Sequence, residues 1–261
     1  MKVRMKMTKT GPIRYVGHLD FMRFFQKALR RSGILTAFSR GYSPHMLISF
    51  ASPLGVGLES LAEYVDVDLA YRDDFKLSES DVQHLKNMGL ENEELPPVPA
   101  SEVLAEMVNR EMPEGVRVLL MRRVGVTDKA MALVTGADYL VFLKNGFLKD
   151  TDLASAIASF LAEESIVIHK VTPKSESNVD IRPLIRELTV SDEYEAAPEG
   201  YERALFMSLS AGSAANLKPE TVVEALCRHL GQVYEPLALR ILRTEMYAGD
   251  RKPFSEIGEA F

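Results

Sequence analysis

The chain has 261 residues, of which 46% are hydrophobic and 26% charged, with a formal net charge of −6 at pH 7. That length suits one large domain or two ordinary ones with a substantial core, and the composition is that of a soluble globular protein. No apolar run approaches the roughly 20 residues that span a bilayer, and the charged, alternating N-terminus MKVRMKMTKT excludes a signal-peptide core.

The first strand is expected at residues 2–9, because Val3, Met5 and Met7 alternate with charged residues. After the Gly11-Pro12 break, a helix is predicted from residue 18 to residue 32, ending before Gly33. Its apolar stripe and its basic face are formed by residues spaced three or four apart. The stripe consists of Phe21, Met22, Phe25, Ala28 and Leu29, and the basic face of Arg23, Lys27, Arg30 and Arg31.

Strands are then expected at 46–51 and 63–69, followed by a helical insertion near 76–100, a helix at 101–111 and a strand at 116–124. In the second half the spacing predicts strands at 138–143, 166–171, 179–190, 203–209 and 237–246, with an irregularity at Pro183, and helices at 150–164 and 219–230. The order strand, helix, strand, strand, helix, strand is that of a ferredoxin-like domain.

We therefore predict an α+β protein with two tandem ferredoxin-like (βαββαβ) domains and antiparallel sheets. The basic N-terminal domain covers 1–126 and contains the insertion near 76–100. The second domain covers 137–248, and a loose C-terminal tail follows at 249–261. Phe21, Phe25 and Leu29 should be buried against the first sheet, and Ala154, Ile157 and Leu161 against the second.

The net charge conceals an asymmetry along the chain. Residues 1–57 hold ten Lys or Arg and one acid, Asp20, which gives +9; the remainder holds 21 bases and 36 acids, which gives −15. A basic lobe on an acidic body indicates a polyanion or an acidic protein as partner. The alternative is that the two parts neutralise each other within the fold.

The sequence lacks the common signatures of cofactor and metal chemistry. One cysteine, Cys227, excludes a disulfide framework, a cysteine-rich zinc site and a cysteine-ligated iron–sulfur cluster within one chain. There is no GxxxxGK[ST] loop and no GxSxG elbow, and the five histidines lie far apart at positions 18, 45, 84, 169 and 229. We expect no metal, no cofactor and a cytoplasmic location.

The candidate binding residues surround the first helix. Arginine supplies bidentate contacts to phosphate, and an exposed tyrosine supplies a face on which a base stacks. The predicted RNA- or partner-binding set is Arg14, Arg23, Lys27, Arg30, Arg31, Arg40, Tyr42 and His45.

An alternative role for this region is acid–base chemistry by Asp20, His18 or His45. GHLD is similar to the Gly-x-Leu-Asp of pseudouridine synthases, in which the aspartate is a nucleophile, but the rest of that motif is missing. An aspartate in the first turn is also favoured by the helix N-terminus, so we expect a structural role for Asp20 and no catalytic residue.

Two stretches carry a resemblance to a known family: RYVGHLDFMRFFQKALRRSGI at 14–34 and AFSRGYSPHMLISFASPLGVGLESLAEYVDVDL at 37–69. With SNVDIRPLIRELTV at 177–190, they resemble the bacterial radical-SAM-linked family of unknown function. Members are encoded beside, or fused to, a radical-SAM protein, and they tend to sit near ribosomal and RNA-processing genes. The resemblance implies a radical-SAM partner and an RNA or ribosomal substrate.

The function expected from these observations is that of a non-catalytic accessory or substrate-binding subunit of a radical-SAM enzyme, which presents RNA or a ribosomal component. Two alternatives stay open. One is an RNA-modifying or RNA-processing enzyme that uses His18, Asp20 or His45, and the other is a protein-interaction adaptor whose basic lobe docks an acidic surface.

Overall fold

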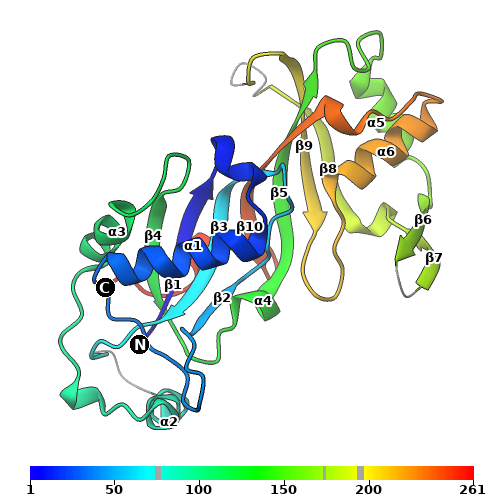
Figure 1. Cartoon of the computed structure of the whole chain (residues 1–261). Helices are drawn as coiled ribbons and strands as arrows, with labels where there is room; N and C mark the ends of the chain where they lie inside the picture. The colour runs from blue at the N-terminus through cyan, green and yellow to red at the C-terminus, as the bar shows by residue number, and fades with distance from the viewer. Residues whose placement is uncertain (74–77, 173–174, 193–196) are drawn as a thin grey trace. The chain divides into compact units, whose positions relative to one another are not determined.

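The computed structural model describes residues 1–73, 78–172, 175–192 and 197–261 (Figure 1). The chain is a mixed α+β protein whose strands pair mostly antiparallel. It divides into two compact units: unit 1 comprises residues 1–134 and 247–261, and unit 2 comprises residues 135–246. Among the described residues, no helix combines the length and apolar character needed to cross a bilayer.

The sheet of unit 1 is organised around its first strand. β1 (Lys2–Lys9) pairs antiparallel with β3 (Glu59–Asp68) on one side and β4 (Val118–Val124) on the other, and β2 (Ile48–Phe50) pairs antiparallel with β3. The register places Met5 opposite both Val65 and Met121. These side chains belong to one buried apolar cluster, which confirms the alternation of apolar residues predicted for β1.

The amphipathic helix α1 (His18–Arg31) covers this apolar face (Figure 1). Phe21, Phe25 and Leu29 are buried in the same cluster as Met5, as the sequence predicts. Burial of each such side chain stabilises the fold by about 1.5–3 kcal/mol. The helix ends before Gly33, which adopts φ +77°, a conformation that costs glycine little. A second helix, α3 (Ser101–Asn109), adds Leu104 and Val108 to the cluster.

Charged side chains on the opposite face of β1 are also buried. The Arg4 Nε lies 2.7 Å from Asp66 Oδ1, and the Nη2 lies 3.0 Å from Oδ2, with both side chains almost inaccessible. Asp66 also accepts a hydrogen bond from the backbone N–H of Ala130 in α4 (Ala130–Leu133). Phe254 covers this pair, because the Arg4 guanidinium lies 5.0 Å from the centre of its ring.

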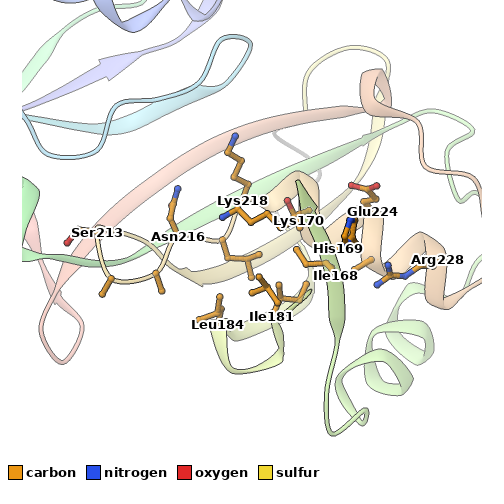
Figure 2. Close-up of a pocket in the computed structure, with 17 residues that line it drawn as sticks. Ile168, His169, Lys170, Ile181, Leu184, Ser213, Asn216, Lys218, Glu224 and Arg228 are labelled. Atoms are coloured by element: carbon orange, nitrogen blue, oxygen red, sulfur yellow. The ribbon is translucent and has the colours of Figure 1, made fainter. Parts of the chain in front are cut away.

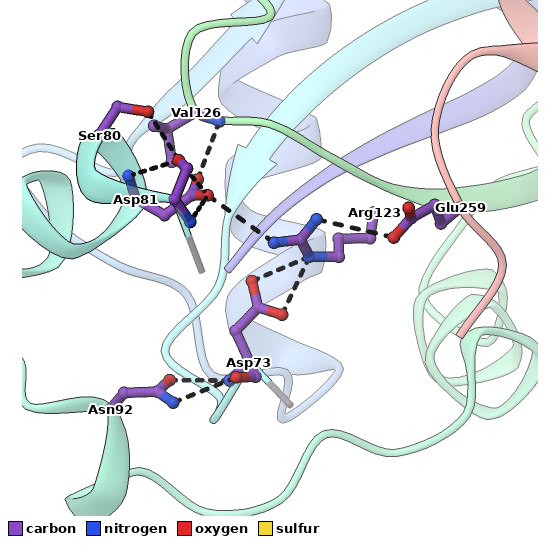
Figure 3. Close-up of polar contacts among 8 residues, drawn as sticks. Asp73, Ser80, Asp81, Asn92, Arg123, Val126 and Glu259 are labelled. Carbon is purple, nitrogen blue, oxygen red and sulfur yellow. Dashed lines mark hydrogen bonds and ion pairs between the residues drawn. The ribbon is translucent and has the colours of Figure 1, made fainter. Parts of the chain in front are cut away.

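The predicted insertion near 76–100 contains α2 (Glu79–Met88) and the 3-10 turn η2 (Asn92–Glu94), while residues 76–77 lie outside the described part. Arg123 holds this segment through buried carboxylates (Figure 3). Its Nε lies 2.9 Å from Asp73 Oδ1, and its Nη2 lies 3.9 Å from Asp81 Oδ2. Asp81 also accepts from the backbone N–H of Val126, so α2 is tied to the segment that follows β4.

The C-terminal segment 249–261 differs from the loose tail predicted for it. Residues 252–253 (β11, Lys252–Pro253) pair with residues 247–248, and η6 (Phe254–Glu256) buries Phe254 to 1% exposure. The backbone groups of Glu259 and Arg123 exchange two hydrogen bonds of 2.9 Å. Apolar burial and backbone pairing therefore fix a segment that its terminal position had suggested to be loose.

Unit 2 contains the strands β5 (Val134–Lys144), β8 (Ile185–Ser191), β9 (Tyr201–Ser210) and β10 (Leu239–Ala248), in the order β10-β5-β9-β8. Its helices are α5 (Leu153–Leu161) and α6 (Pro219–His229), and η5 (Pro236–Ala238) precedes β10. β6 (Val167–Thr172) and β7 (Ser175–Asp180) form a separate hairpin.

Two details of unit 2 bear on the sequence predictions. The irregularity predicted at Pro183 within the strand at 179–190 is present as the 3-10 turn η3 (Arg182–Leu184), because Pro183 lacks a backbone N–H for the ladder. The buried face of α5 consists of Leu153, Ala156, Ile157 and Phe160. Ile157 is thus buried as predicted, whereas Ala154 is exposed and Leu161 is half-buried. Asp152 caps this helix by accepting from the N–H groups of Ala154 and Ser155, which sets the start of its apolar stripe.

Candidate functional site

Four cationic side chains project from the exposed side of α1, opposite its buried stripe. We call them the α1 basic face: Arg23, Lys27, Arg30 and Arg31, all exposed. Their spacing of three or four residues brings them to one side of the helix, as predicted. Since the buried stripe orients the helix, the same packing that stabilises unit 1 also directs these charges into solvent.

The four cations differ in their partners. Arg23 lies 3.1 Å from the Asp20 carboxylate one turn earlier, and the Arg31 Nε lies 2.7 Å from Glu111 Oε2. Arg30 lies 5.7 Å from the centre of the partly exposed Phe38 ring, and Lys27 has no polar partner among the described residues. Two of the four charges are thus compensated locally, while Lys27 and Arg30 are available to an anion.

The remaining predicted binding residues occupy separate settings. Arg14 lies 3.4 Å from Glu59 and donates a hydrogen bond to the Tyr15 hydroxyl, and this bond, together with the Glu59 charge, raises the pKa of Arg14. The Arg40 guanidinium occupies the space that a side chain at Gly89, just beyond the end of α2, would take. Tyr42 is fully exposed. Within the described residues, no ring contact or polar bond joins Arg40, Tyr42 or His45 to the α1 basic face, so their convergence stays a prediction.

The residues of the acid–base alternative have individual partners rather than shared ones. His18 packs edge-on against Phe50 with ring centres 5.0 Å apart, and burial lowers its pKa. Asp20 is exposed and pairs with Arg23, and His45 Nδ1 lies 2.7 Å from the Ser39 hydroxyl. In the described part of the chain, no hydrogen bond or ion pair links any two of these three residues.

Sequence reasoning missed the buried cations of β1. Lys2 donates to the carbonyl oxygen of Val126, Lys9 donates to that of Val16, and Arg4 pairs with Asp66. These residues account for part of the +9 charge of residues 1–57 and are not exposed. The alternation of β1 indicated a second, charged face but not its burial, because the partner Asp66 lies 62 positions away.

Sequence reasoning also missed a pocket in unit 2, with a volume of about 810 Å³, between the β6–β7 hairpin, α6 and the loop 211–218. Figure 2 shows its apolar side chains Ile168, Ile181 and Leu184 close together. Basic side chains from all three elements line it: Lys170, Lys218 and Arg228. These three residues are distant from one another in sequence, so no local sequence motif predicts the pocket.

Metal-ligating and nucleophilic groups are sparse. The described residues contain no group of three or more His, Cys, Asp or Glu side chains arranged to hold a metal ion. Cys227 is buried in α6, and burial raises the pKa of its thiol to about 11, so the thiol is protonated at neutral pH.

Comparisons with known proteins point to one family. The family model described as "Uncharacterized protein conserved in bacteria (DUF2344)" matches residues 2–94 and 87–219. No curated protein matches the chain. A chain in the crystal structure of a Cbf5–Nop10–Gar1 complex is similar with a TM-score of 0.44 and 9% identity, over 94% of this chain and 48% of that one. This chain therefore spans about half the length of that neighbour, and so low a TM-score does not establish a shared fold.

Proposed function

This chain belongs to the DUF2344 family of uncharacterized proteins conserved in bacteria, and on that premise we propose that it is a non-catalytic accessory subunit that binds RNA on the α1 basic face. The substrate is a free RNA or an RNA-containing ribosomal component, and the partner is a radical-SAM enzyme. The observation that carries the RNA-binding proposal is the exposure of Lys27 and Arg30 without a carboxylate partner among the described residues.

The chemistry of this surface supports RNA as the ligand. Cations supply contacts to the phosphate backbone, and aromatic rings supply surfaces on which unpaired bases stack. Arg30 lies over Phe38, whose ring is partly exposed, so a cation and an aromatic side chain adjoin at the edge of the α1 basic face. Single-stranded RNA is recognised through this combination of groups.

The radical-SAM partner rests on the resemblance of residues 14–34, 37–69 and 177–190 to the radical-SAM-linked family. The chain itself has one cysteine, and a radical-SAM cluster requires three cysteine ligands, so the radical chemistry belongs to the partner. A pull-down from the native host with the tagged chain should recover a radical-SAM protein. If that protein is expressed but not recovered, the accessory role is wrong while RNA binding remains to be judged by its own assay.

We also propose that each unit is a ferredoxin-like domain. The strand order β4-β1-β3-β2 in unit 1 and β10-β5-β9-β8 in unit 2 supports this, because each unit follows the order strand, helix, strand, strand, helix, strand. In this description, α2 and the β6–β7 hairpin are insertions into the two domains. An experimental structure with another strand order in either unit would refute it.

The RNA-binding proposal is tested with fluorescently labelled single-stranded RNA and a charge-matched pair of variants. Lys27→Ala/Arg30→Ala should weaken binding at least tenfold, because both phosphate contacts are lost. Lys86→Ala/Arg117→Ala removes two exposed cations of unit 1 that lie outside α1, and it should leave the affinity within about twofold. Equal losses in the two variants would show that binding depends on net charge alone and would overturn the assignment to α1.

A further inference from the structure

The pocket of unit 2 has the size and lining of a small-molecule site. Its volume of about 810 Å³ falls in the range of ligand pockets, roughly 300–1,000 Å³. Every part of its wall belongs to unit 2, so it is independent of the α1 basic face in unit 1. One side is apolar and the rest is polar and cationic, which is the usual division between binding surface and orienting groups.

The polar wall favours an anion. The lining contains three basic side chains, Lys170, Lys218 and Arg228, and one acidic side chain, Glu224. Neither lysine has a polar partner among the described residues, whereas Arg228 donates one hydrogen bond, 2.7 Å long, to the carbonyl oxygen of Val167. The Lys, Arg and Glu side chains of the lining therefore give an excess of two positive charges, and both lysine ammonium groups are free to bind an anionic group.

The loop 211–218 adds uncharged hydrogen-bonding groups to the same wall. Ser213 and Asn216 line the pocket, and their side chains have no hydrogen-bond partner among the described residues. The backbone N–H groups of residues 212–216 likewise donate no hydrogen bond to any described residue. This loop thus offers donors to ligand oxygen atoms without breaking an existing bond.

The opposite wall is suited to a flat apolar group. This wall is formed by Ile168 of β6, by Ile181, which directly follows β7, and by Leu184 of η3. The three side chains lie together in Figure 2. Ile181 is 1% exposed and anchors this wall in the core, while Ile168 and Leu184 are half-buried and present apolar surface to the pocket. A planar ring placed here would gain apolar burial while its charged substituent reaches the lysines.

We propose that this pocket binds a nucleoside phosphate, with the base against Ile168 and Leu184 and the phosphate held by Lys170 and Lys218. This site goes beyond the proposed RNA-binding face, because no residue of α1 takes part in it. The same chemistry is presented by a free mononucleotide and by the phosphorylated end of an RNA strand.

Calorimetric titration of the full chain with the four ribonucleoside 5′-monophosphates tests the site, with the unphosphorylated nucleosides and inorganic phosphate as part-ligands. At least one monophosphate should bind saturably, with a Kd below about 1 mM. The matching nucleoside and inorganic phosphate should each bind at least tenfold more weakly, since each retains half of the contacts. If no monophosphate binds, or inorganic phosphate binds as tightly as the best monophosphate, the proposal is wrong.

Variants locate the binding and separate it from the α1 basic face. Lys170→Ala/Lys218→Ala should weaken monophosphate binding at least tenfold, while Lys144→Ala/Lys149→Ala, which removes two exposed lysines of unit 2 outside the pocket, should not. Lys27→Ala/Arg30→Ala should leave it unchanged, so the failure of either proposal is visible alone. Equal effects of the two unit 2 variants would overturn the pocket assignment. If a 5′-phosphorylated hexanucleotide competes with the monophosphate for the pocket, the natural ligand is the end of an RNA strand. If the hexanucleotide does not compete, the ligand is a free nucleotide.

Discussion

Asp20 is the residue for which a catalytic role and a structural role were both considered. It belongs to the GHLD stretch, and its carboxylate lies 3.1 Å from the Arg23 guanidinium. Gly17, and not Asp20, is the N-cap of α1, and among the described residues no side chain makes a capping hydrogen bond to this helix. Asp20 lies in the first turn of α1, where its negative charge interacts favourably with the positive end of the helix dipole and so stabilises the helix. Its carboxylate also neutralises one cation of the α1 basic face.

The first prediction therefore concerns Asp20→Asn. The variant should fold with a stability within about 0.5 kcal/mol of the wild type, since an exposed i,i+3 pair contributes little. RNA binding should be retained or strengthened, because Arg23 is released from its partner. Filter binding and thermal unfolding measure the two quantities. If the variant instead loses a chemical activity on RNA while it still binds RNA, the enzyme alternative is correct.

Asp81 provides a pH-dependent prediction. Burial raises the pKa of its carboxyl, but hydrogen bonds from the Ser78 side chain and from the backbone N–H groups of Ser78 and Val126, together with Arg123, outweigh burial and lower it below 3.8. Because the folded-state pKa is the lower one, the carboxylate stabilises the fold above about pH 3.8. This stabilisation is lost as the pH falls through the folded-state pKa.

The difference in unfolding free energy between the wild type and Asp81→Asn should therefore be constant near neutral pH and shrink below about pH 4. Urea titrations at a series of pH values measure it. The exposed carboxyl of Glu79 in the same helix offers a matched control, Glu79→Gln. A difference for Asp81→Asn that stays constant down to acid pH would contradict the role given to the Asp81 charge.

At the scale of elements, β1 combines an apolar face under α1 with a face of buried charge. The Arg4–Asp66 pair lies in the middle of the β1–β3 ladder, where the two residues are directly opposite. A buried pair of this kind adds little net stability over an apolar pair, yet removal of one partner leaves the other charge without compensation.

The prediction for β1 is a double-mutant cycle. Arg4→Met should destabilise unit 1 by about 3–5 kcal/mol, and Arg4→Met/Asp66→Leu should be less destabilised than Arg4→Met alone. Urea unfolding followed by circular dichroism measures the stabilities of Arg4→Met, Asp66→Leu and the double variant. Additive losses in the cycle would show that the pair is not coupled, against the 2.7 Å geometry.

The elements that the sequence predicts well are those whose signal is local. The spacing of Phe21, Phe25 and Leu29 indicates both the extent of α1 and its buried face, and the same spacing places Lys27 on the opposite side. The Asp20–Arg23 pair, three positions apart, was also accessible from sequence. Because Gly33 marks the end of the helix, the predicted last residue, 32, differs by one from the observed last residue, Arg31.

The features that the sequence did not predict depend on long-range contacts. Arg31 finds its partner Glu111 80 positions away, and the C-terminal segment is held by Arg123, 136 positions from Glu259. The pocket of unit 2 joins side chains from β6, α6 and a loop that share no spacing pattern. Periodicity reports which face of an element is apolar but not which distant element covers it.

At the scale of the whole molecule, the charge asymmetry is real but smaller at the surface than the count suggests. Lys2, Arg4 and Lys9 are buried, and Arg23 and Arg31 have carboxylate partners. The acidic partner predicted for the basic lobe is thus partly supplied by the fold itself, as the alternative interpretation of the charge asymmetry anticipated. The positive charge of α1 that is left to bind an external anion is that of Lys27 and Arg30.

The most direct test of RNA binding by the α1 basic face is the salt dependence of the affinity. Each phosphate contact releases counterions, so the logarithm of the binding constant falls with the logarithm of the salt concentration by about 0.7–0.9 per contact. The slope for Lys27→Ala/Arg30→Ala should be shallower than that of the wild type by roughly one to two units, with the slope of Lys86→Ala/Arg117→Ala unchanged. A slope for Lys27→Ala/Arg30→Ala equal to the wild-type slope would contradict the account.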